Sequence, residues 1–401
     1  MPHAEGFLAR ARALPGRVAP GLDEWLWNRA RDRECAKILN RDDYADRLAG
    51  VASRGAATRP TRLVIVPMDG PDVPTWRIAG GNFFFEIAQA AREYLTPDEV
   101  SIFAVSPGER PADWHERLIR HLVDTGATHV MAQVESDPNA PPSWTWDILW
   151  SQLMTRWDGV FLGVMFDSAY RWLTIHTRRM ARMSDRFMLV DICTPMDGVL
   201  VPRRPEVGPV NMPVSDASLA LIDEHVAGMG KELDVSFIGA LYPYRVELID
   251  ELAARGVNVA VNPHRSDQTR DLAESRANQP TYVDYMAGLA RSRMTINFSR
   301  SSAGDFQQLK TRVLEASAMG CVVLTDDADR TSRFWAPGEF GFFADPRDVP
   351  DLVEGFLRDP ERLEAAQAAA RDRARSLNVT SFWGGTQEGL RRRGLPTLLH
   401  S

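Results

Sequence analysis

The stretch "LKTRVLEASAMGCVVLTDD", residues 309–327, decides the fold, because in it a helical pattern leads directly into a short strand. Its apolar residues recur at helical spacing, and an uninterrupted apolar run then ends in threonine and aspartate. Two cations, Lys310 and Arg312, stand near the start of the helix, and a carboxylate, Glu315, lies in its middle. A helix that feeds a buried strand predicts an α/β protein, and charged residues at the edge of its sheet are candidates for ligand binding.

The same alternation of strand and helix runs along most of the chain, which predicts βαβ units and parallel sheets. One series begins at "TRLVIVPMDG" (61–70), and a second follows a crossing at 193–214 that is rich in proline and glycine. The expected strands are 62–67, 100–105, 128–134, 159–166 and 187–192, then 234–239, 257–262, 293–299, 321–325 and 341–345. The expected helices are 83–95, 112–125, 144–157 and 169–183, then 244–255, 281–291, 308–319 and 349–357.

We therefore expect two tandem Rossmann-like, doubly wound domains of the α/β class that face a cleft. Ligands of such sheets bind at the carboxyl ends of the strands, which places them between the domains. The helical amino-terminal extension has faces that suit dimerisation, capping of the first sheet or contact with a partner. The expected units are a helical extension (1–58), an amino-terminal domain (59–205), a linker (206–231), a carboxyl-terminal domain (232–375) and a closing helix (376–401).

The composition is that of an ordinary globular protein, with 44% hydrophobic and 25% charged residues. A length of 401 residues favours two domains. The formal net charge of −7 argues against nucleic acid or an anionic membrane as a general partner, since both are bound through excess Lys and Arg. Three scattered cysteines, no CxxC pair, no run of about 18 apolar residues and no apolar leader predict a cytoplasmic protein, either free or peripheral at the inner face of a membrane.

The long first loop of the first sheet carries several candidates. Gly80 and Gly81 lead into a helix, where a glycine pair lets the backbone approach a ligand and the first helical amides favour an anion; a plain, tightly packed turn is the alternative. Asp69 and Arg77 in the same loop are candidates for positioning an acceptor. Neither sheet supplies the GxGxxG fingerprint after its first strand, which disfavours a dinucleotide-dependent dehydrogenase.

The second series of strands carries a denser group of candidates. Gly239 ends a strand and Arg245 opens the next helix, which offers amides and a guanidinium at one sheet edge. Lys310 is expected in the first turn of its helix, where the helix dipole favours an anion. Arg312 lies one turn from Glu315, so a surface ion pair is the plain alternative. Apolar neighbours bury most of that helix, however, and a half-buried carboxylate needs partners such as two vicinal hydroxyls.

Together with "FWAPGEFGFFADPRDVPDLVEGFLRDPERLEAA" (334–366), the stretch at 309–327 resembles the donor-domain signature of glycosyltransferases of the GT-B architecture, in the glycosyltransferase group 1 superfamily. The resemblance is greatest to the spore-maturation, CgeB-like branch. It spans about residues 232–375 and includes the opening "DVSFIGALYPYRVELIDELAARGVNV" (234–259). The motifs are specific for the superfamily and uninformative about substrates.

The resemblance implies roles for particular residues. Glu315 falls on the glutamate that holds the ribose of the nucleotide, and Lys310 or Arg312, with Arg245, falls where cations meet the diphosphate. The glycine pair of the first loop falls on the family's glycine loop. Fixed cations would stabilise a leaving nucleoside diphosphate without a metal or another cofactor, which gives Lys310 and Arg245 a catalytic role. Gln307 stands where many retaining members have a glutamate that touches the sugar, so retention and inversion both stay open.

The proton acceptor is expected in the first domain. Asp167 follows a strand end and is the candidate base of an inverting enzyme, with capping of the next helix as the alternative. His264, after a strand of the second domain, is a further candidate. Four tryptophans at helical spacing are expected to pack in a core rather than to stack on a sugar: Trp144, Trp146, Trp150 and Trp157.

These observations predict a glycosyltransferase of the hexosyltransferase type, which moves a sugar from a nucleotide-diphosphate donor to an acceptor hydroxyl. The acceptor is open between a glycan, a lipid-linked glycan, a protein and a small molecule, and a homodimer through the amino-terminal helices is allowed. One alternative is a sugar-nucleotide epimerase, which would form product from the donor alone. Another is a non-catalytic protein that binds nucleotide sugars. The donor base and sugar are not determined by the sequence.

Overall fold

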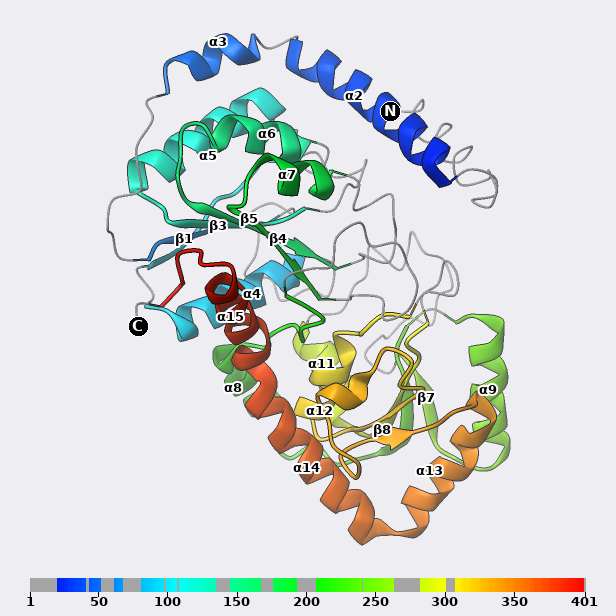
Figure 1. The fold of residues 1–401 in the computed structure, drawn as a ribbon. Coiled ribbons are helices and arrows are strands. Elements are labelled where there is room, and N and C mark those ends of the chain that lie inside the picture. Colours follow the sequence, from blue (N-terminus) through cyan, green and yellow to red (C-terminus); the bar gives the residue numbers. More distant parts are fainter. Residues whose placement is uncertain are drawn as a thin grey trace.

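The structure, a computed structural model, describes residues 20–40, 43–51, 61–67, 81–96, 99–106, 108–134, 145–166, 176–192, 207–239, 241–262, 282–300 and 307–399. Within these ranges the chain forms two lobes, each built on a five-stranded parallel sheet with helices on both faces (Figure 1). The long helix α14 (Pro360–Val379) runs along one side of the molecule and leads from the second lobe back to the first.

The first sheet has the strand order β2-β1-β3-β4-β5. Its register places Leu63 of β1 between Val100 of β2 and His129 of β3. Strands β1 and β4 are buried along their whole length, because helices cover both faces of a parallel sheet. The strands are β1 (Leu63–Val66), β2 (Val100–Ile102), β3 (His129–Gln133), β4 (Val160–Met165) and β5 (Phe187–Asp191).

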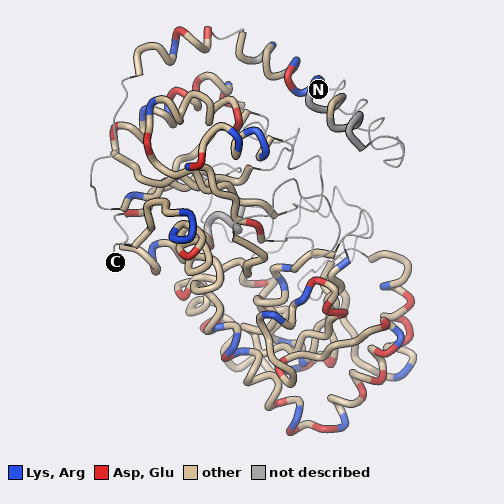
Figure 2. Tube along the Cα trace, in the orientation of Figure 1, with Lys and Arg blue, Asp and Glu red and all other residues tan. Residues whose placement is uncertain are grey.

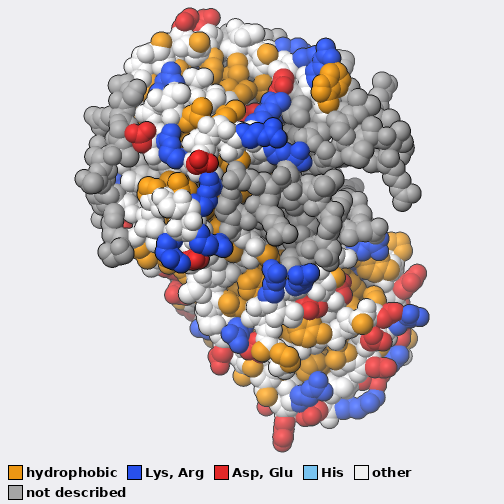
Figure 3. Space-filling model, viewed as in Figure 1, with side chains coloured by type: hydrophobic (Ala, Val, Ile, Leu, Met, Phe, Trp, Pro, Cys, Tyr) orange, Lys and Arg blue, Asp and Glu red, His pale blue; other side chains and the backbone are white. Residues whose placement is uncertain are grey.

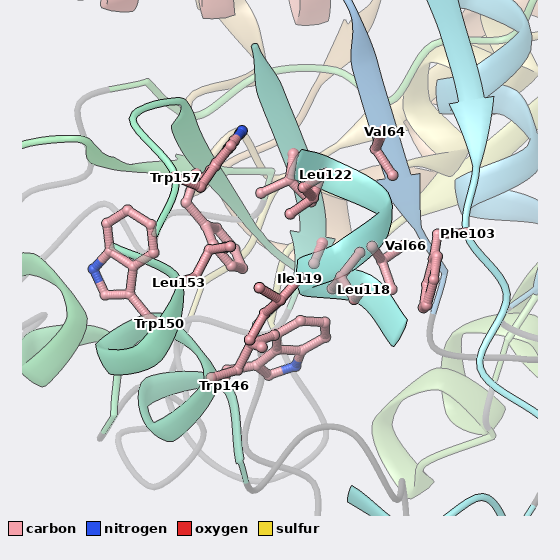
Figure 4. Close-up of a cluster of buried hydrophobic side chains, with 14 of the residues drawn as sticks. Val64, Val66, Phe103, Leu118, Ile119, Leu122, Trp146, Trp150, Leu153 and Trp157 are labelled. Carbon is pink, nitrogen blue, oxygen red and sulfur yellow. The ribbon is translucent and has the colours of Figure 1, made fainter. Parts of the chain in front are cut away.

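Three helices, α5 to α7, cover one face of the first sheet with an aromatic core (Figures 1 and 4). Trp146, Trp150 and Trp157 are all buried in it, which confirms the packing role predicted for them. The indole N–H groups of Trp150 and Trp157 donate to backbone carbonyls at 3.2 and 2.7 Å. Trp144 lies outside the described residues. The helices of this lobe are α2 (Pro20–Asn40), α3 (Tyr44–Ala49), α4 (Gly81–Tyr94), α5 (Pro111–Thr125), α6 (Trp146–Leu153) and α7 (Thr177–Met183).

The other face of the first sheet is covered by α4 and by the carboxyl-terminal end of the chain (Figure 1). After α14 the chain passes through a short π-helical segment, Thr380–Gly384, into α15 (Gly385–Arg392). A Cβ atom at Gly389 would lie 2.3 Å from the side chain of Val207, so only glycine lets α15 pack this closely. The buried side chains that this end contributes are Phe382, Trp383, Leu390 and Leu398.

The second sheet has the order β10-β9-β8-β6-β7. Its core lies on both faces: α8, α11 and α12 pack on one, α9 and α13 pack on the other, and α14 contributes residues to both cores. The strands are β6 (Leu233–Phe237), β7 (Val259–Val261), β8 (Ser292–Asn297), β9 (Val322–Thr325) and β10 (Gly341–Phe342). The helices are α8 (Asp216–His225), α9 (Pro243–Ala254), α11 (Tyr282–Ala290), α12 (Arg312–Ala318) and α13 (Val349–Arg358).

Two glutamates of α4 in the first lobe cap the start of α8 in the second. The carboxylate of Glu86 accepts a hydrogen bond from the N–H of Ser215 at 2.6 Å and another from the hydroxyl of Ser218. Glu93 accepts from the N–H groups of the two residues after Ser215, at 2.9 and 3.0 Å. The first N–H groups of a helix have no partner within it, so these carboxylates join the lobes by satisfying them. Burial raises the pKa of Glu86 to about 7.

The amino-terminal helices pack on the first lobe. Arg31 of α2 is 1% exposed and forms a two-pronged ion pair with Asp147 at the start of α6. Arg179 of α7 binds Asp32 at 2.7 Å on the same helix α2. Leu48 at the end of α3 completes the aromatic core. Of the three roles considered for the amino-terminal extension, these contacts fit capping, because α2 and α3 lie over the helices that cover the first sheet.

The predicted two-domain, doubly wound α/β architecture is confirmed, and the differences are local. The helix expected at 308–319 begins only at Arg312, because the N–H of Gln308 donates to the carbonyl of Ser299 at 2.9 Å and keeps this segment extended. The expected linker, 206–231, is divided between the cores of the two lobes after Met212. No helix among the described residues has the length and apolar character needed to cross a bilayer.

Candidate functional site

Both sheets have a reversal of winding direction that forms a potential ligand-binding position at their carboxyl edge. Numbered within its own lobe, each sheet has the order 2-1-3-4-5, so the direction of winding reverses between β1 and β3 and between β6 and β8. Ligands of open α/β sheets bind outside the carboxyl ends of the strands at such a reversal. In the second lobe this position is formed by Gly239, after β6, and Ser299, after β8. In the first lobe it involves residues 68–80, which lie outside the described residues.

Gly239 leaves room at the second reversal. Its φ of 137° is one that only glycine adopts without strain, and its N–H donates to the side-chain oxygen of Asn262 at 2.9 Å. A Cβ atom at Gly239 would stand 3.5 Å from Nη2 of Arg312. A ligand atom in the place of the missing side chain would therefore meet the guanidinium of Arg312 and, at 3.7 Å, the ring of Phe237.

Glu315 of α12 is a buried carboxylate with two phenolic partners. It is 7% exposed, and the hydroxyls of Tyr282 and Tyr285 on α11 donate to its two oxygens at 3.0 and 2.8 Å. Burial raises the pKa of Glu315, while these hydrogen bonds and the charge of Arg312 oppose the rise. The plain alternative, a surface ion pair between Arg312 and Glu315, is wrong, because Glu315 is buried among tyrosines and Arg312 lies beside Gly239.

Lys310 lies outside the helix, which corrects the expectation that it stands in the first turn. Its ammonium donates to the side-chain oxygen of Gln308 at 2.9 Å. Arg312 is instead the first residue of α12. With only seven residues α12 is too short for its dipole to carry an argument, so the positive charge of this edge comes from the side chains themselves. Figure 3 shows Lys and Arg side chains on the part of the second lobe that is nearest the first, and Figure 2 marks Lys and Arg positions there along the trace.

Arg245 is held in an aromatic surround rather than in solvent. It is 8% exposed, and its guanidinium carbon lies 4.7 Å from the ring centroid of Tyr242 and 5.3 Å from that of Phe298. Its Nε donates to the hydroxyl of Tyr244 at 2.9 Å. Cation–π contacts of this kind fix the charge of Arg245 at the end of β6.

Gln307 belongs to a short chain of polar groups at the end of β8. The hydroxyl of Ser299 lies 2.7 Å from the Gln307 side chain and in contact with the carboxylate of Asp326, which follows β9. The Ser299 hydroxyl has one proton, which it can donate either to Oε1 of Gln307 or to the carboxylate of Asp326. Because the amide oxygen of Gln307 faces Ser299, its NH2 group is left as the donor for a further hydroxyl.

The candidates of the first lobe are not brought together with this group by the described residues. Gly81 is the first residue of α4. Every other candidate predicted for this lobe lies outside the described residues, as does His264 of the second lobe, and these roles stay predictions. The candidates concerned are Asp69, Arg77, Gly80 and Asp167.

Several residues of this edge were missed by reasoning from the sequence. Tyr282 and Tyr285 are three positions apart in "YVDYM" and therefore share a helix face, which is a usable signal. Nothing in the sequence indicates that this face meets α12. Ser299 and Asp326 follow strand ends, as ligand-binding residues often do, but their pairing depends on the order of the strands. Among the described residues, no group of three or more His, Cys, Asp and Glu side chains could hold a metal ion.

Comparison with solved structures defines the class of fold as GT-B. An α-glucosyltransferase in complex with UDP and a DNA containing an HMU base is 10% identical, with a TM-score of 0.53 over 84% of this chain and 100% of that one. The HepE protein of Anabaena in complex with UDP is 11% identical, with a TM-score of 0.50 over 83% of this chain and 100% of that one. At such identities the likeness shows the fold.

A family profile described as "Glycosyl transferase-like" matches residues 245–380, about a third of the chain. The match contains Glu315 with both of its tyrosine partners, and Arg312. No curated protein matches the sequence significantly. The CgeB-like branch of the superfamily stays a prediction.

Proposed function

We propose that this protein is a glycosyltransferase, which takes a sugar from a nucleoside-diphosphate donor and passes it to an acceptor hydroxyl. The observation that carries the proposal is a buried carboxylate, Glu315, within reach of the charge of Arg312, a cation that lies beside Gly239 at the winding reversal of the second sheet. The family match covers both residues, and the GT-B fold supports the same reading.

In this proposal each group of the nucleotide has a partner. The two ribose hydroxyls donate to the oxygens of Glu315, because a carboxylate accepts two such bonds. The diphosphate lies in the space beside Gly239, where Arg312 faces it. Arg245 and Lys310 add positive charge from the neighbouring segments.

The same cations act on the chemical step. As the bond between sugar and diphosphate breaks, negative charge develops on the leaving phosphate, and cations fixed nearby stabilise that charge more than they stabilise the ground state. Arg245 is held by aromatic rings, so it needs little reorganisation when the charge appears. We propose that these side chains perform the neutralisation that a metal ion performs elsewhere.

Gln307 is proposed to bind a hydroxyl of the donor sugar through its amide NH2 group. Ser299 and Asp326 fix its amide, as described above. The proton of the acceptor hydroxyl would be taken by a base of the first lobe, for which Asp167 remains the candidate. A hexose is the expected sugar, and the acceptor is left open.

A thermal-shift panel of UDP, GDP, CDP and thymidine diphosphate, with their glucose esters, tests the donor. UDP is the first candidate, because both structural neighbours described above are complexes with UDP. One diphosphate is expected to raise the melting temperature by mass action, and Glu315→Ala is expected to reduce that rise. No shift with any diphosphate would contradict the proposal.

Turnover of the donor identified in this way separates enzyme from binding protein. Hydrolysis or transfer of the sugar, followed by mass spectrometry, is expected for a glycosyltransferase. An isomerised sugar nucleotide formed without acceptor would indicate an epimerase, and binding without any turnover would indicate a sensor.

A further inference from the structure

The two tyrosines of α11 give Glu315 a fixed direction. Tyr282 and Tyr285 are each 6% exposed, and their hydroxyls reach opposite oxygens of the same carboxylate, at 3.0 and 2.8 Å. Their rings stack with centroids 6.0 Å apart, so each ring restricts the movement of the other. Carboxylate rotation about the last bond of Glu315 would break both hydrogen bonds together.

Each tyrosine can act only as a donor toward this carboxylate. Burial, and then the charge of Glu315, hold the pKa of both phenols far above its ordinary value, so each hydroxyl keeps its proton at neutral pH. Glu86 is the other carboxylate near Tyr282, and its two oxygens already accept hydrogen bonds from Ser215 and Ser218. The single proton of Tyr282 is therefore given to Glu315.

Counting acceptor sites shows what is left for a ligand. A carboxylate accepts about two hydrogen bonds per oxygen. Among the described residues, one tyrosine hydroxyl occupies one site on each oxygen, which leaves the second site of each oxygen. Two sites on neighbouring oxygens, at fixed orientation, fit two hydroxyls on adjacent carbon atoms.

We propose that Tyr282 and Tyr285 are positioning residues, which set the preference of this site for ribose over deoxyribose nucleotides by fixing the direction of Glu315. The inference rests on the proposed function and concerns how strongly the site discriminates between ribose and deoxyribose in the nucleotide. A site that is built around hydroxyl donors discriminates strongly against an analogue that lacks one, because its buried acceptor is then left unpaired.

A purely structural role is the competing account. Two tyrosines that only satisfy a buried carboxylate would affect stability, and would affect all ligands alike. A positioning role changes the ratio of affinities between ribose and deoxyribose forms of one nucleotide. That ratio is therefore the readout.

The experiment uses the full chain and isothermal titration. Wild type is titrated with UDP, GDP, ADP and CDP, and the tightest ligand is compared with its 2′-deoxy form and with pyrophosphate. We expect wild type to prefer the ribose form by about tenfold or more. Tyr285→Phe and Tyr282→Phe are each expected to reduce the preference to about threefold or less. Pyrophosphate binding is expected to stay unchanged in Tyr282→Phe, whereas the Tyr285 hydroxyl also interacts with Arg312.

Tyr44→Phe is the matched control, because it removes a half-buried tyrosine hydroxyl from the first lobe, where Tyr44 binds His115 at 2.7 Å. It is expected to keep the wild-type preference. Circular dichroism verifies the fold of each variant, and should one tyrosine variant fail to fold, the other single variant carries the test.

Glu315→Gln separates failure of this inference from failure of the proposed function. Should Glu315→Gln abolish the preference while both tyrosine variants keep it, the positioning role is overturned and the ribose contact stands. Should Glu315→Gln keep the preference as well, the proposed ribose contact is overturned. Should wild type bind none of the four diphosphates, the proposed function falls, and the inference with it.

Discussion

Arg312 and Lys310 stand two positions apart in the sequence, yet the fold gives them different surroundings. Arg312 faces Gly239, whereas Lys310 donates to Gln308 beside the strand end. Arg312→Ala is therefore expected to weaken binding of UDP by about tenfold or more, since a hydrogen bond to a charged group contributes about 1.5 to 3 kcal/mol. Lys310→Ala is expected to reduce the affinity for UDP by a smaller factor.

Calorimetry with UDP and with uridine checks this prediction. Both variants are expected to bind uridine almost as wild type does, because the lost charge acts on the phosphates. Equal losses of affinity for uridine and for UDP would show that Arg312 maintains the fold of the site and does not bind the diphosphate.

Glu86 predicts a pH dependence of stability. Its pKa is raised by burial to about 7 in the folded protein, from an ordinary value of 4.5. Between pH 4.5 and pH 7 the folded state holds a proton that the unfolded state has lost. Glu86 therefore contributes most to the free energy of unfolding below pH 4.5, and this contribution is lost as the pH rises through 7. Wild type should therefore lose about 2 kcal/mol relative to Glu86→Gln between pH 5 and pH 8.

Urea unfolding of both proteins at several pH values measures this difference. Glu93→Gln is the control at the same helix end, where the glutamate accepts bonds from exposed N–H groups. A difference between wild type and Glu86→Gln that stays constant with pH would contradict the assignment.

The charged members of the site were predictable from the sequence, and their partners were not. Arg312 and Glu315 could be selected because they interrupt an apolar helix. Whether they face each other or face other groups depends on α11 and on the end of β6, which are distant in sequence. Tyr285 and Asp326 could be identified only once the packing of helices and the order of strands were known.

At the scale of elements, α2 is attached to the first lobe by a buried charge. Arg31→Ala is expected to destabilise the protein by about 3 kcal/mol, because among the described residues it leaves the buried carboxylate of Asp147 with the more distant Arg179, at 3.4 Å, and the N–H of Ile148, at 3.1 Å. Arg33→Ala, at an exposed position of the same helix, is the matched control. Urea midpoints and limited proteolysis of α2 measure the effect, and equal midpoints for the two variants would refute it.

Element types were predictable where periodicity was strong, and boundaries failed where a backbone partner intervened. The alternation of apolar strands with amphipathic helices was enough to predict two doubly wound sheets. The start of α12 was misplaced because the N–H of Gln308 pairs with Ser299 instead of beginning a helix. Helical propensity alone carries no information about such a tertiary hydrogen bond.

At the scale of the molecule, the first lobe depends on residues from the end of the chain. Trp383→Ala is expected to destabilise the first lobe by about 3 to 5 kcal/mol, since this indole is fully buried against the first sheet. Trp25→Ala, at a site that is 51% exposed, is the control. Nucleotide binding by the second lobe should persist at temperatures where the first lobe of Trp383→Ala has melted.

Differential scanning calorimetry with and without UDP distinguishes the lobes. For Trp383→Ala we expect two transitions: the first lobe melts at the lower temperature, and the second lobe melts at a higher temperature that UDP raises further. A single transition shifted as a whole would mean that the two lobes unfold as one cooperative unit.

The return of α14 and α15 to the first lobe has a consequence for biosynthesis. A ribosome makes the strands of the first sheet before those of the second, but Leu398, which closes one face of the first sheet, is made after all the described strands. The first sheet therefore exposes an apolar surface until this segment has been made. A stop codon between β10 and Phe382 would spare the described strands of both sheets and still leave the first sheet uncovered.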